Sequence, residues 1–151
     1  MKEIHLIVVG KLADKNIEFL EQEYLKRLSG LKFTIHEVKS HSENLDLESR
    51  EVKNKINEIT KNDTPYIVLL TEKGKQFESR LFSNWLFEKT PSAKIIFVIG
   101  GAAGHGNDII QMSSFKLSLS EFTFPHKLAR LLFVEQVYRA MTIKDNHPYH
   151  K

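Results

Sequence analysis

Residues 94–106 read KIIFVIGGAAGHG, and this stretch decides the fold class. Its first six residues are apolar apart from Lys94 and rich in β-branched side chains, which is typical of a strand buried on both faces. Glycines at positions 100, 101, 104 and 106 follow immediately. Because glycine has no Cβ, the chain can turn sharply there and another group can approach its backbone closely. The stretch therefore predicts a buried strand that ends at a glycine turn.

Strand and helix patterns alternate on both sides of this stretch. Apolar or alternating runs predict strands, and apolar residues at helical spacing predict helices between them. The predicted strands are residues 4–9, 31–38, 66–70, 94–99 and 115–120, and the predicted helices are residues 14–30 with Asp14 as N-cap, 43–59, 81–86, 107–112 with Asn107 as N-cap, and 126–143. Such regular alternation predicts an α/β fold, with a mostly parallel sheet and helices on both faces.

Length and composition predict one globular domain over residues 1–151. Hydrophobic residues make up 41% and charged residues 27% of the chain, enough for a substantial core. No run of about 20 apolar residues could span a bilayer, and the apolar run near the N-terminus resembles a first strand more than a signal peptide, so we expect a cytoplasmic protein without membrane contact. Zero cysteines exclude disulfides, thiolate metal sites and cysteine nucleophiles.

The net charge of +3 is mild but unevenly placed. Residues 122–151 carry all the excess of basic over acidic side chains and hold three of the seven histidines. This distribution suits a polyanionic partner, although a solvated basic surface explains it equally well. The last predicted helix is apolar around most of its circumference, more than one sheet face can cover, which predicts a homodimer.

Three strand ends carry unusual residues: LLTEKGK (69–75), GGAAGHG (100–106) and SLSEFTFPH (118–126). Ligands of open parallel sheets bind at the carboxyl ends of strands, so neighbouring ends would frame one pocket with free backbone amides. The alternative is that the glycines serve only the turn itself.

Familiar catalytic motifs are absent. Neither G-x-G-x-x-G nor GxxxxGK[ST] occurs, which disfavours a dinucleotide or ATP site, and no GxSxG surrounds Ser118 or Ser120. The histidines of HPYH (147–150) have a spacing that could share a metal, but no carboxylate accompanies them, so we predict no metal site and favour a tail that contacts a partner.

Several segments together resemble one known family. VVGK (8–11), VIGG (98–101), LSLSEFTFPH (117–126), LARLLFVEQVYRA (128–140) and HPYHK (147–151) are similar to the RlmH family of SPOUT-class methyltransferases, which methylate N3 of a pseudouridine in large-subunit ribosomal RNA. The resemblance extends over the whole chain, and the combination of TFPH, EQVYRA and YHK is specific.

The resemblance implies a homodimeric α/β fold with a C-terminal trefoil knot that binds S-adenosylmethionine. It also implies a substrate, a pseudouridine in helix 69 of 23S rRNA within the assembled ribosome. Carried over by position, the cofactor contacts would be Leu70, Gly100, Leu119, Ser120, Glu121, Phe122, Thr123 and Phe124. For the RNA contacts we expect His105, Arg130, Tyr149 and His150, since an aromatic ring can stack on an unpaired base and basic side chains can contact phosphate.

The residue that accepts the imide proton of the target base stays open. His126, Glu121 and His150 are candidate bases, and Arg130 or Arg139 could stabilise the anion. His105 departs from the family pattern, in which an aliphatic residue often follows the third glycine of the turn. Two other function classes remain as alternatives: a non-catalytic RNA- or ribosome-binding α/β protein, and a nucleotide-binding α/β enzyme.

Overall fold

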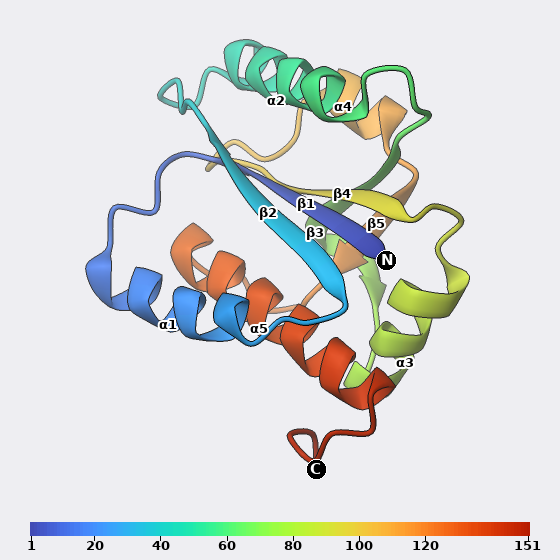
Figure 1. The fold of residues 1–151 in the computed structure, drawn as a ribbon. Helices are drawn as coiled ribbons and strands as arrows, with labels where there is room; N and C mark the ends of the chain where they lie inside the picture. The colour runs from blue at the N-terminus through green and yellow to red at the C-terminus, as the bar shows by residue number, and fades with distance from the viewer.

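The computed structural model describes all 151 residues and contains a five-stranded, wholly parallel sheet between two layers of helices (Figure 1). The strands are β1 (Lys2–Val9), β2 (Leu31–Val38), β3 (Tyr66–Gln76), β4 (Lys94–Ile99) and β5 (Phe115–Ser118). The helices are α1 (Lys15–Lys26), α2 (Leu45–Thr60), α3 (Ser79–Asn84), which continues into the π-helical segment η1 (Trp85–Lys89), α4 (Asn107–Met112) and α5 (His126–Lys144). The strand order β2-β1-β4-β3-β5 confirms the predicted parallel α/β fold.

Side chains of the central strands alternate between two hydrophobic cores. In β1, Ile4, Leu6 and Val8 belong to the core shared with α3 and α5, whereas Ile7 and Val9 belong to the core under α2 and α4. Figure 1 shows α2 and α4 on one face of the sheet and α1, α3 and α5 on the other. Each fully buried aliphatic side chain contributes about 1.5–3 kcal/mol, which explains why residues 6–9 of β1 and 95–99 of β4 are unbroken apolar runs.

Strand β3 differs from its prediction because it continues six residues past Leu70. Its pairing with β5 shifts between Leu70 and Lys75, which both lie opposite Leu117, so residues 71–74 form a bulge. The shift depends on Gly74, since a Cβ there would lie 2.6 Å from the backbone of Leu117. The bulge places Thr71, a half-buried residue, and the exposed residues that follow it at the carboxyl end of the sheet.

Of the two predicted helix N-caps, one is confirmed and the other is wrong. Asp14 caps α1 as predicted, accepting hydrogen bonds from the N–H groups of Asn16 and Ile17. The predicted cap at Asn107 is wrong: the N-cap of α4 is Gly106, without a side-chain hydrogen bond. No helix of the chain is long and apolar enough to span a membrane.

Candidate active site

The carboxyl ends of β3, β4 and β5 surround a cavity of about 410 Å³, within the size range of small-ligand sites. The three segments singled out in the sequence therefore lie together, because β4, β3 and β5 are neighbours in the sheet. Seven of the eight predicted cofactor contacts line the cavity: Leu70, Gly100, Leu119, Ser120, Phe122, Thr123 and Phe124. Glu121 does not line it, and its side chain is exposed.

A second depression of about 460 Å³ lies at the opposite edge of the sheet. Its lining includes Met1, Asp63 and Lys94, at the amino ends of strands and in the loops beside them. We favour the smaller cavity, although the other has the larger volume, because ligands of parallel sheets bind at the carboxyl ends and the glycine turn lies there.

Several backbone amides of the cavity form no hydrogen bond within the chain. The N–H groups of Gly100 and Ala102 donate no hydrogen bond, and in residues 119–124 only Phe122 does, to Ser120 Oγ at 3.0 Å. Ser118 Oγ also donates to the Ser120 carbonyl at 2.9 Å, which ends β5 two residues earlier than predicted. A neutral cavity lined by free amides and apolar side chains fits an adenosine-based cofactor such as S-adenosylmethionine.

Gly100 is required by the turn itself, which is the alternative that the sequence left open. A Cβ at Gly100 would lie 2.6 Å from the carbonyl oxygen of Gly104 and 3.2 Å from Nδ1 of His105. The turn itself fills this space, closed by the hydrogen bond from the Gly104 N–H to the Gly101 carbonyl at 2.9 Å. Gly100 thus lets the turn close upon itself, and a larger residue there would disturb the turn as well as any ligand in the cavity.

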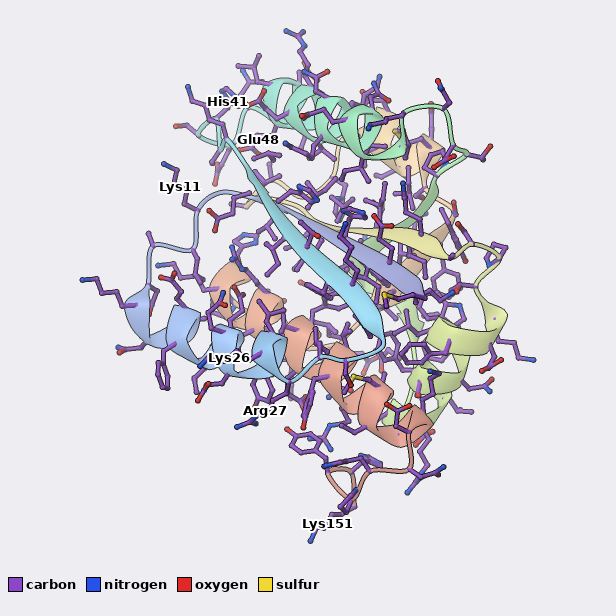
Figure 2. All side chains as sticks on the ribbon, viewed as in Figure 1. Lys11, Lys26, Arg27, His41, Glu48 and Lys151 are labelled. Atoms are coloured by element: carbon purple, nitrogen blue, oxygen red, sulfur yellow. The ribbon has the colours of Figure 1, made fainter.

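A buried carboxylate supports the other side of the turn. Glu48, in the first turn of α2, is 2% exposed, and its Oε2 accepts hydrogen bonds from Ser40 Oγ at 3.1 Å and the His41 N–H at 2.9 Å. Its Oε1 has no partner and lies 2.9 Å from where a Cβ of Gly101 would be. Figure 2 shows Glu48 beside His41, in the region where β2 leads into α2. The sequence offers no sign of this contact, because α2 is remote from the turn along the chain.

His105 links two of the predicted cofactor contacts. Its Nε2 lies 2.9 Å from the carbonyl oxygen of Leu70, and its Nδ1 faces Gly100. Burial lowers the pKa of His105 below its ordinary value, despite the opposing effect of the hydrogen bond to Leu70. The ring is therefore neutral at pH 7 and lines the cavity as a polar, uncharged group.

Arg130 lies outside this cavity and is occupied by two carboxylates. Its Nε and Nη2 donate to both oxygens of Glu21 at 2.7 and 2.9 Å, and its Nη1 donates to Glu37. The residue is 6% exposed. In this arrangement the guanidinium joins α5 to α1 and β2, and two carboxylates balance its charge.

The C-terminal residues fold back onto the last helix. The Tyr149 hydroxyl donates to Glu135 at 3.2 Å, and its ring packs edge-on against Tyr138 and under Arg139. Arg139 also contacts Nδ1 of His150 at 3.0 Å. The terminus lies beyond the last turn of α5 (Figure 1), whereas the cavity lies at the first turn of that helix.

Among the candidate bases, only His126 lines the cavity. Thr71, Glu72 and Lys73, which also line the cavity, belong to the segment LLTEKGK that was expected to frame it. Ala129, from the first turn of α5, was not predicted. Gly74 is the one sign of the bulge in the sequence, since a glycine inside a strand often marks one.

Comparisons with known proteins agree with this architecture. Residues 1–150 match the family model described as predicted SPOUT methyltransferase. Proteins called ribosomal RNA large subunit methyltransferase H are 39% identical in Flavobacterium psychrophilum, with 97% of this chain and 98% of the relative covered, and 41% identical in Mycoplasmopsis synoviae, with 98% and 99% covered. The structure of a probable methylase family protein from Haemophilus influenzae shares the fold, with a TM-score of 0.60 and 15% identity over 98% of this chain and 70% of that one. The chain therefore belongs to the SPOUT methyltransferase family, and within it to the large-subunit ribosomal RNA methyltransferase H proteins.

Proposed function

We propose that this protein transfers a methyl group from S-adenosylmethionine to N3 of a pseudouridine in helix 69 of 23S rRNA, in the assembled ribosome of the cytoplasm. The observation that carries the proposal is the single cavity lined by seven of the eight residues that match the family's cofactor contacts. The names of the relatives support a ribosomal RNA substrate, and the free amides of the glycine turn and of residues 119–124 suit a polar cofactor. The family's C-terminal knot is part of the same proposal.

The chain's residues have limited tasks in such a reaction. The cofactor supplies a methyl group activated by its sulfonium, so the protein must hold the target nitrogen in line and exclude water. The imide proton of the base must leave, and His126 is the candidate base that already lines the cavity. Glu121 lies outside the lining, and His150 is held by Arg139 at the far end of α5.

A second copy of the chain would complete the site. Helix α5 has 19 residues and is about 28 Å long at 1.5 Å per residue, so its C-terminal tail cannot reach the cavity at its first turn. Leu128 and Leu132 are 43% and 38% exposed on the outer surface of this helix, one turn apart. We infer a homodimer through this surface, in which Tyr149 and His150 of one copy approach the cavity of the other and contact the RNA.

The test measures methyl transfer and cofactor binding together. Labelled S-adenosylmethionine should transfer its methyl group to ribosomes that lack the modification, and calorimetry should detect binding of S-adenosylmethionine but not of NAD or ATP. Ala129→Phe should fill the cavity and abolish both, whereas Ala93→Phe, in the depression at the opposite edge, should leave both unchanged. Ribosome binding without cofactor binding would instead favour a non-catalytic RNA-binding protein.

A further inference from the structure

His105 holds a hydrogen-bond acceptor in the cavity that no group of the chain uses. A carbonyl oxygen can only accept, so Nε2 of the ring must carry the hydrogen that it donates to Leu70. In a neutral imidazole the other nitrogen, Nδ1, is then a lone-pair acceptor. No hydrogen bond to Nδ1 is formed within the chain, and the only side-chain oxygen or nitrogen that is both sealed from solvent and unpaired is Glu48 Oε1. Nδ1 is therefore accessible and free.

The position of the ring favours a contact with the cofactor over a contact with RNA phosphate. The ring spans Leu70 at the end of the regular part of β3 and Gly100 at the end of β4, and both residues line the cavity. A neutral ring that offers a lone pair does not attract an anionic phosphate. S-adenosylmethionine instead carries several N–H and O–H donors, on its adenine, its ribose and its α-ammonium group.

We propose that Nδ1 of His105 accepts a hydrogen bond from a donor of the bound S-adenosylmethionine, so that His105 positions the cofactor and does not bind RNA. This inference rests on the proposed function. The Leu70 carbonyl fixes the tautomer and the ring orientation, so the acceptor is in place before the ligand arrives. An aliphatic residue at this position would offer no such acceptor.

Two substitutions test the roles of the two ring nitrogens separately. His105→Gln places an amide N–H where Nε2 lies, which keeps the bond to Leu70 but removes the acceptor at Nδ1. His105→Asn places an amide oxygen where Nδ1 lies, which keeps the acceptor and gives up the bond to Leu70. His41→Gln, in the loop before α2 and outside the cavity, is the matched control.

The probes are S-adenosylhomocysteine and methylthioadenosine, measured by calorimetry at pH 7.5. We expect His105→Gln to weaken S-adenosylhomocysteine about threefold to tenfold, the usual effect of one lost hydrogen bond, and His105→Asn to weaken it less. His41→Gln should bind like the parent. An equal loss for methylthioadenosine would place the donor on the adenosine part, and a loss confined to S-adenosylhomocysteine would place it on the amino-acid part.

Equal affinity of the parent and His105→Gln for S-adenosylhomocysteine would overturn the inference. It would also be overturned if His105→Gln bound the cofactor normally and lost only methyl transfer, since His105 would then act on the RNA. A parent protein that binds neither probe would remove the proposed function and this inference with it. Circular dichroism and urea unfolding of each variant exclude misfolding as the cause, and His105→Asn gives an independent measurement if His105→Gln does not fold.

Discussion

At the scale of single residues, the ion pair of Arg130 and Glu21 is the most deeply buried charge interaction of the chain. The two side chains are 8% and 2% exposed and meet through a two-pronged contact. Arg130 also contacts Glu37, whose carboxyl pKa is lowered: burial raises it, but the hydrogen bonds from Arg130 and the Leu12 N–H outweigh burial. Arg130 could hold α1, α5 and β2 together or bind RNA. The two roles predict different effects of its substitution on stability and on methyl transfer.

We predict that Arg130→Met lowers the free energy of unfolding by about 3–5 kcal/mol, because it leaves the Glu21 carboxylate buried without a partner. Urea unfolding measures the loss. The double variant Glu21→Leu with Arg130→Met should regain most of it, since no unpaired charge then remains at that contact. Arg80→Met, at an exposed arginine without an ion pair, should have no measurable effect. A stable Arg130→Met protein that only loses methyl transfer would favour the RNA-binding role.

Residue-scale features of the site were only partly predictable. The glycine turn and SLSEFTFPH could be singled out because ligands of open parallel sheets bind at the carboxyl ends of strands. The contacts that require Gly100 and Gly101 could not be predicted, because the atoms that exclude a Cβ come from Gly104 and from Glu48 of a separate helix. Such contacts depend on tertiary packing, which no local pattern encodes.

At the scale of elements, β1 and β2 share a polar contact within an otherwise apolar face. His5 Nδ1 lies 2.9 Å from His36 Nε2, and His5 Nε2 lies 2.7 Å from Glu3. Burial lowers the pKa of His36, and the neighbouring His5 and Lys55 lower it further against the opposing effect of Glu58. The folded chain therefore favours neutral His36 more than the unfolded chain does.

This contact predicts that stability falls when the pH drops below the ordinary histidine pKa of about 6.5. The unfolded chain then binds a proton at His36 that the folded chain resists, so the contribution of His36 is fully present above that pH and is lost below it. Urea unfolding at steps between pH 7.5 and 5.5 measures the slope. His36→Gln should flatten it, because the variant lacks the imidazole that resists protonation in the folded chain. An unchanged slope would contradict the prediction.

Substitutions at two positions of α5 distinguish the proposed dimer surface from the core. Leu132 is 38% exposed whereas Val137 is fully buried. Leu132→Arg should yield a folded monomer in light scattering, because it places a charge in the subunit contact. Val137→Arg should unfold the chain, because the charge has no partner in the core. Leu81→Arg, at another exposed apolar residue on α3, should remain dimeric and folded; a dimeric Leu132→Arg protein would exclude this surface.

Elements as a whole were the most predictable level. The apolar runs of β1 and β4 and the spacing of α2 follow from burial on defined faces, and their positions were predicted to within a few residues. The continuation of β3 through Gln76 was not, because TEKGKQ is polar and its pairing depends on β5, about 40 residues later in the chain.

At the scale of the whole molecule, the cavity and the C-terminal tail lie at opposite ends of α5, which is why we infer that one copy completes the site of another. Figure 2 shows Lys11 and His41 on one side of the molecule and Lys151 on the other, beyond α5. Basic side chains therefore lie at both ends of the molecule, and the proposed dimer would bring one end of each copy together at the RNA.

Deleting residues 149–151 should therefore abolish methyl transfer to ribosomes while leaving S-adenosylmethionine binding intact. The fold should lose about 2–4 kcal/mol, since the tail contributes two hydrogen bonds, one edge-on aromatic contact and one cation–π contact. Labelled cofactor with unmodified ribosomes measures the transfer, and urea unfolding measures stability. Tyr149→Phe is the control, because it removes only the hydroxyl contact with Glu135. Normal turnover by the shortened chain would contradict the proposed role of the tail.

The order of the chain also affects how the protein is made. The core under α2 and α4 uses residues no later than Met112, whereas the core on the opposite face depends on Phe133, Val134 and Val137 of the last helix. During synthesis one face of the sheet can be covered early, but the other stays open until the final residues leave the ribosome. The nascent chain therefore exposes a broad apolar surface late in its synthesis, and a chaperone that shields such surfaces has its main opportunity to bind just before release.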